Sequence, residues 1–297
     1  MRILLTNDDG LKTEGLKALH NELERVFGQG TITVVSPLHQ QSAVSHSITI
    51  FSPLFIEKVN GYLNNKSSLY AVQGTPTDCV KLALRYLMNS KPAVVVSGIN
   101  EGANVGVDVF YSGTVAGAIE GALWGIPSFA VSTETPNPAP LGVQGKVAVN
   151  PMWFTGGKRP DFKLSARLAV NIIKTLLDAK LPAGRAFNIN VPNSGRRAIK
   201  GIKYTRQDIR LSPEEFERGI DPRGRHYYWM KPGPKRFDLR LSGYHSSKYL
   251  KRIKTEECIL PSDLETLRAG YISVTPLRTN LTDYQLLAYL PKHIAKK

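Results

Sequence analysis

The stretch Ile3-Leu-Leu-Thr-Asn-Asp-Asp-Gly10, close to the start of the chain, decides how the rest is arranged. Its first residues predict a short buried strand, and two adjacent acids, Asp8 and Asp9, follow directly. In an extended strand the two side chains would point to opposite faces. Gly10 can adopt backbone angles closed to other residues, so a turn here can bring both carboxylates to one side.

Two carboxylates that share one mouth repel each other, and a proton or a cation relieves the repulsion. Oxygen ligands of this kind favour Mg²⁺, Mn²⁺ or Ca²⁺ over the metals that thiolates bind. The alternative is an Asp-Asp-Gly turn with an acid at the start of the next helix. This stretch alone leaves both interpretations open.

The segment after Gly10 predicts a βαβ unit. From Thr13 to Phe27 apolar residues recur at helical spacing, and Thr31 to Val35 follows as a second apolar strand. A strand, helix and strand of this length place the two strands parallel. Ala93 to Val96 is too apolar to be half exposed and predicts a central parallel strand. The predicted fold class is therefore α/β with a largely parallel central sheet.

Polar residues follow the carboxyl ends of these strands, where open α/β sheets place their ligands. The Ser42 loop, residues 38–47, also carries His39 and His46, and Asn100 lies immediately beyond the central strand. No GxGxxG or P-loop spacing is present, so a nucleotide cofactor is not indicated.

Between these loops, residues 48–56 and 70–72 predict two short strands. Thr75 and Asp78 have the spacing of a capping box, with Pro76 suited to the first turn of the helix that follows.

The stretch Tyr111 to Ala122 opens a helix with small residues. Such a helix N-terminus directs backbone N–H groups and the positive end of the dipole outward and can bind phosphate. The hydroxyls of Ser112 and Thr114 would add donors. The alternative is a capped core helix. Gly117 and Gly121 predict that this helix lies very close to its neighbours.

The composition is that of an ordinary globular protein. Of the 297 residues, 42% are hydrophobic and 21% are charged, which argues against disorder. Cys79 and Cys258 have no CxxC partner, so we expect neither a disulfide framework nor a thiolate metal site. No apolar run is long enough for a membrane span, and a strand that begins at Arg2 leaves no room for a signal peptide. We therefore expect a cytoplasmic protein without a membrane partner.

Positive charge gathers in the second half of the chain. The formal charge is +15, and residues 196–254 hold 17 of the 39 Lys and Arg but 6 of the 24 Asp and Glu. This segment can contact nucleic acid, attract anionic substrates, or form a solvated basic surface. Within it, the prolines, glycines and aromatic residues from Asp221 to Lys235 predict an extended arm that packs on something else, such as a second subunit.

We accordingly divide the chain into three parts. Residues 1–192 form the catalytic core and residues 193–262 form a basic extended arm used in dimerisation. Residues 263–297 return to the core through a strand at 270–277 and a short helix at 284–290.

Put side by side, these pieces resemble the SurE family, the survival-protein-E acid phosphatases and 5′-nucleotidases. The resemblance covers nearly the whole chain in order, and so many short motifs in sequence are highly specific. The matching stretches are Ile3–Gly10, the Ser42 loop before Ser47–Thr49, Gly74–Cys79, Val95–Asn100, Tyr111–Thr114, Phe187–Pro192, Asp221–Gly224 and Gly270–Pro276.

The resemblance implies a Rossmann-like α/β sandwich with a C-terminal extended arm that is exchanged in homodimers, often assembled into homotetramers. It also implies one divalent cation per subunit, for which we expect Mg²⁺ or Mn²⁺. The residues that match the family's metal ligands are Asp8, Asp9, Ser42 and Asn100, and those that match its phosphate contacts are Ser112, Gly113 and Thr114. Among them we expect Asp8, Asp9 and Asn100 to be catalytic.

Two departures from the family pattern stand out. Family members commonly have Ala-Pro-Gly after the acidic turn, whereas Thr13-Glu14-Gly15 stands there in this chain. Glu14 adds a negative charge near the metal site. The stretch from Lys235 to Pro261 is longer and more basic than the family's usual arm.

The sequence hypothesis is therefore metal-assisted hydrolysis of nucleoside 5′-monophosphates. The rival is a nucleic-acid-binding protein that uses the basic arm, and no recognised nucleic-acid motif favours it. A haloacid-dehalogenase-type phosphatase needs Asp-x-Asp after the first strand, whereas the acids here are adjacent.

Overall fold

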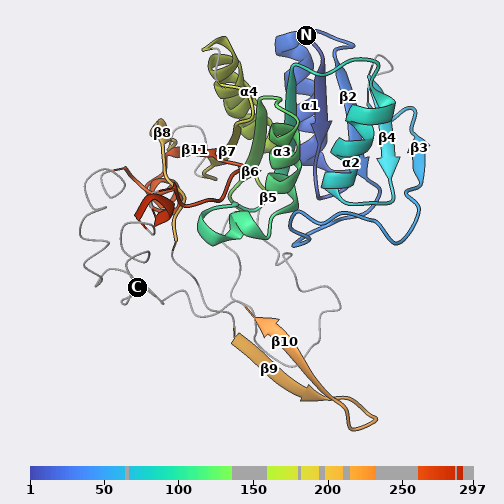
Figure 1. Ribbon diagram of the computed structural model, residues 1–297, viewed down its shortest axis with the longest axis vertical. Helices are drawn as coiled ribbons and strands as arrows, with labels where there is room; N and C mark the ends of the chain where they lie inside the picture. The colour runs from blue at the N-terminus through green and yellow to red at the C-terminus, as the bar shows by residue number, and fades with distance from the viewer. Residues whose placement is uncertain are drawn as a thin grey trace.

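The first strand, β1 (Ile3–Thr6), lies inside a nine-stranded sheet, and all four of its residues are buried (Figure 1). The structure is a computed structural model that carries side chains. It describes residues 1–63, 67–135, 159–179, 182–193, 198–209, 215–231, 260–284 and 286–289.

Six neighbouring strands of the sheet run parallel, in the order β4-β2-β1-β5-β6-β7. If the short strand β3 is set aside, this is the doubly wound order 3-2-1-4-5-6, in which the chain winds first to one side of β1 and then to the other. The predicted α/β fold with a largely parallel sheet is confirmed. The other five strands are β2 (Ile32–Pro37), β4 (Ser68–Val72), β5 (Val94–Glu101), β6 (Ser128–Thr133) and β7 (Ala186–Val191).

Three short strands extend the sheet at its two edges. At one edge β3 (Ile56–Lys58) pairs antiparallel with β4. At the other, β11 (Ile272–Leu277) pairs antiparallel with β7, and β8 (Ile202–Tyr204) pairs parallel with β11. The prediction of a strand over 48–56 is wrong for residues 48–55. Pairing with β4 begins at residue 56 and is followed by a hydrogen bond from the Val59 N–H to the Leu69 carbonyl oxygen, whereas Thr49 bonds to Asp78 at the start of α2.

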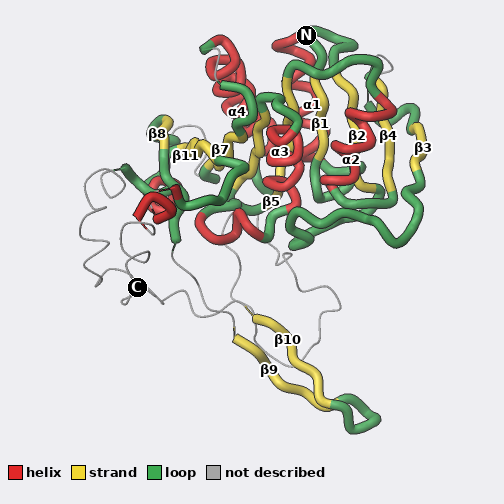
Figure 2. The backbone as a smooth tube through the Cα atoms, viewed as in Figure 1, coloured by secondary structure: helices red, strands yellow, loops and turns green. Residues whose placement is uncertain are grey.

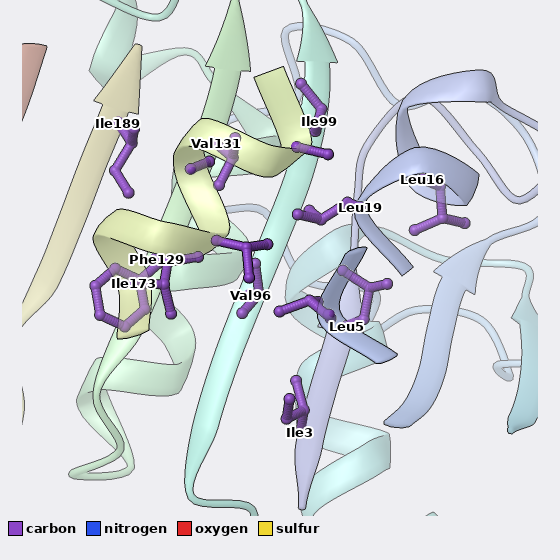
Figure 3. Packing of buried hydrophobic residues seen from close by; sticks show 14 of the residues in the cluster. Ile3, Leu5, Leu16, Leu19, Val96, Ile99, Phe129, Val131, Ile173 and Ile189 are labelled. Atoms are coloured by element: carbon purple, nitrogen blue, oxygen red, sulfur yellow. The ribbon is translucent and has the colours of Figure 1, made fainter. Parts of the chain in front are cut away.

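Helices cover both faces of the sheet (Figures 1 and 2). Side chains alternate along a strand, so Ile3 and Leu5 face one layer while Leu4 faces the other. The first layer holds α1 (Glu14–Phe27) and α4 (Phe162–Asp178), and the second holds α2 (Pro76–Leu82) and α3 (Gly113–Leu123). Figure 3 shows the larger cluster, in which Leu16, Leu19 and Ile173 pack on residues of the central strands.

The local signals for the helices are confirmed. Thr75 and Asp78 form the predicted capping box of α2, which continues into a π-helical turn, η1 (Ala83–Leu87). Ser112 caps α3 by accepting a hydrogen bond from the Val115 N–H. A Cβ on Gly15 would lie 2.3 Å from the Ile99 carbonyl oxygen, so glycine at this position lets α1 lie directly on β5.

The part of the chain assigned to the arm divides into two regions. Strand β8 belongs to the central sheet. Strands β9 (Glu215–Ile220) and β10 (His226–Lys231) form a separate antiparallel hairpin that stands away from the sheet (Figure 1). The boundaries of the arm at 193 and 262 remain predictions.

The returning segment contains α6 (Asp263–Arg268) and β11, and residues 284 and 286–289 are helical near the C-terminus, as predicted. Most of the irregular segment at 136–160, Cys258 and nearly all of the basic stretch 235–261 lie outside the described residues. Cys79 is a free, buried cysteine. Within the ranges that the structure covers, no helix combines the length and apolarity needed to cross a bilayer.

Gly117 and Gly121 let α3 lie against the sheet, as the sequence predicts. A Cβ on Gly121 would lie 2.5 Å from Ser128 Oγ and 2.7 Å from Val95 Cγ2. On Gly117 the closest atoms, on Ser97 and Thr6, would be 3.0 and 3.1 Å away.

These distances predict different effects for the same substitution in one helix. Overpacking costs roughly 1–3 kcal/mol, whereas Gly to Ala in a helix returns about 1 kcal/mol of propensity. We expect Gly121→Ala to lower the free energy of unfolding by ~1–2 kcal/mol and Gly117→Ala to change it by less. Urea denaturation of both variants measures this, and a larger loss in Gly117→Ala would contradict the packing.

Candidate active site

The candidate site lies at the carboxyl edge of the sheet, between β1 and β5. These strands are neighbours, and the connections that follow them leave in opposite directions. Ligands of open α/β sheets bind in the crevice outside such a switch point. Asp8 and Asp9 follow β1, and Asn100 is the next-to-last residue of β5. The topology therefore brings together two of the predicted motifs.

Asp8 is 4% exposed and is held by the N-terminus of α3. The Thr114 N–H donates to its Oδ2 at 2.9 Å, and the Thr114 hydroxyl donates to its Oδ1. A Cβ on Gly113 would lie 2.9 Å from the Cβ of Asp8. Glycine at 113 therefore permits the carboxylate to approach the helix end this closely.

Asp9 is the more open of the two acids. The Glu101 N–H donates to its Oδ2 at 3.2 Å. Burial, followed by the charge of Asp8, raises the pKa of Asp9 to about 7. Burial also raises the pKa of Asp8, although the hydrogen bonds from Thr114 act in the opposite sense. The pair thus favours any positive charge that is placed between its oxygens.

The Ser42 loop packs directly on this acidic turn. The Gln41 N–H donates to the Asp8 carbonyl oxygen at 2.7 Å. The Gln40 side chain donates to Ser42 Oγ at 2.9 Å and lies close enough to the Asp9 carboxyl to lower its pKa slightly, against the larger effect of burial. Through Gln40, Ser42 is linked to Asp9 across more than thirty residues of sequence.

Asn100 is oriented by its own loop. Its Nδ2 donates to the Gly102 carbonyl oxygen at 2.7 Å, which leaves the side-chain oxygen as an acceptor. The peptide bond Gly98–Ile99, just before it, is cis.

The residues predicted to hold phosphate are engaged within the protein. Ser112 Oγ accepts from Val115, and both donors of Thr114 reach Asp8. The contact between Thr114 and Asp8 was not foreseen from the sequence. It shows that the α3 terminus orients the acidic turn, and a phosphate-binding role for residues 112–114 remains a prediction.

Sequence reasoning also missed Asn7, Gln40 and Glu101. Asn7 is fully buried. Its Nδ2 donates to the Gly10 carbonyl oxygen at 2.8 Å, and its side-chain oxygen accepts from Ser36 Oγ at 2.6 Å. Asn7 thus links the end of the acidic turn to strand β2. Its place beside the two acids is the one signal that the sequence offered. Gln40 and Glu101 are recognisable only after their loops have been brought together.

The donor set at this edge suits a hard cation. It comprises two carboxylates, an amide oxygen and a hydroxyl, all of which are oxygen ligands of the kind that Mg²⁺ and Mn²⁺ accept. Within the described part of the chain, no group of three or more His, Cys, Asp and Glu residues is arranged to hold a metal. His46, in the Ser42 loop, bonds to Glu120 on α3.

Comparison with known proteins identifies the family. The family model described as "Survival protein SurE" matches residues 3–213. The chain belongs to the SurE family.

Full-length SurE relatives align over almost the whole chain. Relatives named 5′-nucleotidase SurE include one from Thermoanaerobacter sp. (strain X514), 35% identical over 98% of this chain and 97% of its own. Another, from Geotalea daltonii, is 37% identical over 98% of each chain. The crystal structure of the SurE protein from Aquifex aeolicus superposes with a TM-score of 0.70 at 34% identity, covering 98% of this chain and 99% of that one.

Glu14, the departure from the SurE pattern, lies at the rim of the site. It is 65% exposed, and its Oε1 pairs with Arg159 at 3.2 Å. Glu14 and Arg159 both act on the carboxyl of Glu101, with opposite effects on its pKa, which burial raises overall. The extra negative charge of this chain is therefore partly offset by a cation at the same rim.

The contact between Thr114 and Asp8 predicts a test on the protein without metal. Thr114→Val keeps the side-chain shape but removes the hydroxyl that donates to Asp8, and a lost partner of a buried carboxylate costs about 1–3 kcal/mol. We expect that loss in urea denaturation of the metal-free protein. Thr114→Ser retains the hydroxyl and is the matched control. Equal losses in both variants would show that the hydroxyl does not hold Asp8.

Proposed function

We propose that this SurE family member is a phosphomonoesterase that hydrolyses nucleoside 5′-monophosphates with one divalent cation, Mg²⁺ or Mn²⁺. The observation that carries the proposal is the pair Asp8 and Asp9 at the switch point, one buried and one partly buried, with their pKa values raised. The names of the relatives support the same activity.

The residues that would hold the cation are Asp8, Asp9, Ser42 and Asn100. When bound there, the cation supplies positive charge against the phosphate oxygens as negative charge develops. Thr114 holds Asp8 in place from one side, and Glu101 and Gln40 hold Asp9 from the other.

The two acidic residues, Asp8 and Asp9, would have different roles in the reaction. Both oxygens of Asp8 accept hydrogen bonds from Thr114, so Asp8 is fixed in orientation. Asp9 is more open and accepts one backbone hydrogen bond, from the Glu101 N–H, so its carboxylate keeps oxygen lone pairs for the cation. Attack by water and transfer of the phosphoryl group to an aspartate are both compatible with this geometry. Labelled phosphate trapped on the protein during turnover would identify the second route.

The phosphate would lie at the N-terminus of α3, where Ser112, Gly113 and Thr114 stand. The positive end of the helix dipole favours an anion there. Phe110 and Tyr111, directly before this terminus, are 55% and 54% exposed. Their aromatic rings offer a surface for a nucleobase, because base–aromatic stacking tolerates any base. This supports a nucleotide over a small sugar phosphate as substrate.

The metal proposal predicts the behaviour of Asp8→Asn. The substitution removes one negative charge and one hard ligand from the pair, so we expect phosphatase activity toward nucleoside monophosphates to fall by at least ~100-fold. EDTA should silence the wild type, and Mg²⁺ or Mn²⁺ should restore it. Kinetics on a panel of nucleoside monophosphates and ribose 5-phosphate measures both effects.

Asp178→Asn, an exposed aspartate at the end of α4, is the matched control and should retain full activity. Circular dichroism separates loss of activity from loss of fold. Full activity in Asp8→Asn, or activity unaffected by EDTA, would remove the metal proposal.

We also propose that the β9–β10 hairpin joins two copies of the chain in a homodimer, the unit from which a homotetramer would be built. Cross-strand partners share a face, and on one face Phe216, Tyr228 and Met230 are each more than 60% exposed. An apolar surface of this kind is typical of a protein interface.

Replacing Phe216 and Met230 by Thr keeps strand propensity but removes the apolar side chains. We expect the wild type to be at least dimeric and this double variant to shift toward the monomer in chromatography with light scattering. Tyr86→Thr, a change at a residue of η1 that is 80% exposed, is the control. A monomeric wild type would contradict the proposal.

A further inference from the structure

The Ser42 loop has an unfavourable backbone directly after Ser42. Ala43 and Ser45 have φ values of 57° and 56°, in the left-handed region that residues with a Cβ rarely adopt. Such conformations persist only where surrounding contacts determine them, and they gather at functional sites. The position of Ser42 therefore depends on what holds the loop.

Hydrogen bonds to two other parts of the structure hold the loop along its length, and a third holds the chain just beyond it. The Gln41 N–H bonds to the turn after β1, and Ser45 donates through its N–H to the Tyr111 carbonyl oxygen at 3.0 Å and through its hydroxyl to that of Phe110 at 2.7 Å. Beyond the loop, the hydroxyl and N–H of Thr49 donate to the two oxygens of Asp78 at the start of α2. Within the loop itself, these contacts are made by the backbone of Gln41 and by the backbone and short side chain of Ser45.

One further contact differs from these because a long side chain of the loop itself, that of His46, reaches a buried carboxylate on α3. Glu120, on α3, is 3% exposed, and its Oε2 lies 2.8 Å from Nε2 of His46. Its Oε1 accepts from Lys81 Nζ at 3.0 Å and from Trp124 Nε1 at 2.9 Å. His46 is 32% exposed and is the one residue of the Ser42 loop that contacts Glu120 in the described structure.

Glu120 is a charged anchor rather than a neutral acid. Burial alone would raise its pKa, but the hydrogen bonds from His46, Trp124 and Lys81 outweigh burial and bring the pKa to about 2. A buried carboxylate that keeps its charge holds each of its donors strongly, because losing one leaves charge uncompensated.

Glu120 stands too far from the acidic turn to act on a substrate itself. It follows Thr114 by six residues, which is about 9 Å along the helix at 1.5 Å per residue. Its effect on the site must pass through His46 and the loop. The helix that carries it is the same one whose N-terminus holds Asp8, so α3 contacts both the acidic turn and the Ser42 loop.

We propose that Glu120 and His46 are positioning residues that fix the strained Ser42 loop on α3, so that Ser42 and Gln40 are presented to Asp9 and complete the cation site. This inference rests on the proposed function and extends it to residues that touch neither cation nor substrate. Lys81 shares the carboxylate but does not contact the loop in the described structure, so its role is to balance the charge of Glu120.

The test compares His46→Ala with Lys81→Met. Each removes one partner of Glu120, but only the first frees the loop. Titration calorimetry of the metal-free protein with Mn²⁺ gives the dissociation constant without reference to activity. We expect it to rise ~10–100-fold in His46→Ala, the range seen when an outer partner of a metal site is lost, and less than ~2-fold in Lys81→Met. His46→Gln keeps an N–H donor and should recover part of the affinity.

Two further measurements separate positioning from folding. Circular dichroism melts should show losses of stability of similar size in His46→Ala and Lys81→Met, and hydrogen exchange in residues 40–47 should rise only in His46→Ala. Wild-type affinity for Mn²⁺ in His46→Ala would overturn the inference, as would equal weakening in both variants. A wild type that does not bind Mn²⁺ would instead remove the proposed function beneath it.

Discussion

The site is arranged around two adjacent carboxylates, those of Asp8 and Asp9, which repel each other. Asp8 and Asp9 lie at the carboxyl edge of the central strands; burial raises the pKa of both, and the charge of Asp8 raises that of Asp9 further. Such a pair is stable in the folded protein only if its surroundings hold each acid separately. Thr114 holds the first, and Glu101 and Gln40 hold the second. The packing of α3 and the order of the strands both bring these partners close to the two acids.

The contact with Asp8 requires α3 to lie close to the sheet. A helix end can donate to Asp8 only if the helix lies directly on the sheet, and Gly113, Gly117 and Gly121 remove the side chains that would prevent this. The same helix carries Glu120, which contacts the Ser42 loop. One helix thus orients an acid at its N-terminus and anchors a loop two turns later.

The order of the strands also brings the residues of the site together. Because β1 and β5 are neighbours whose connections diverge, no crossover covers the edge between them, and loops from distant parts of the sequence meet there. The site combines residues near positions 8, 42, 100 and 114. A site assembled in this way is sensitive to the backbone of its loops, which explains why the strained segment around Ser42 is tied down by hydrogen bonds at several points.

Much of the fold could be predicted from the sequence because its signals are local. The βαβ unit, the capping box at Thr75 and Asp78 and the close packing at Gly117 and Gly121 follow from periodicity, from residue spacing and from the absence of side chains. The strand expected over residues 48–56 was wrong for residues 48–55, where Thr49 bonds to Asp78 at the start of α2. A side-chain contact between residues 29 positions apart cannot be recognised from the pattern of neighbouring residues in the sequence.

The candidate site shows the same division. The sequence by itself determined which residue types stand after the strands, and therefore that hard oxygen donors gather at one edge of a parallel sheet. Only the tertiary structure decided that Thr114 serves Asp8, that Gln40 joins Ser42 to Asp9, and that His46 bonds to Glu120. The physical reason is that strand and helix signals act over a few residues, whereas a hydrogen bond forms between whatever groups the packed sheet and helices bring within about 3 Å of each other.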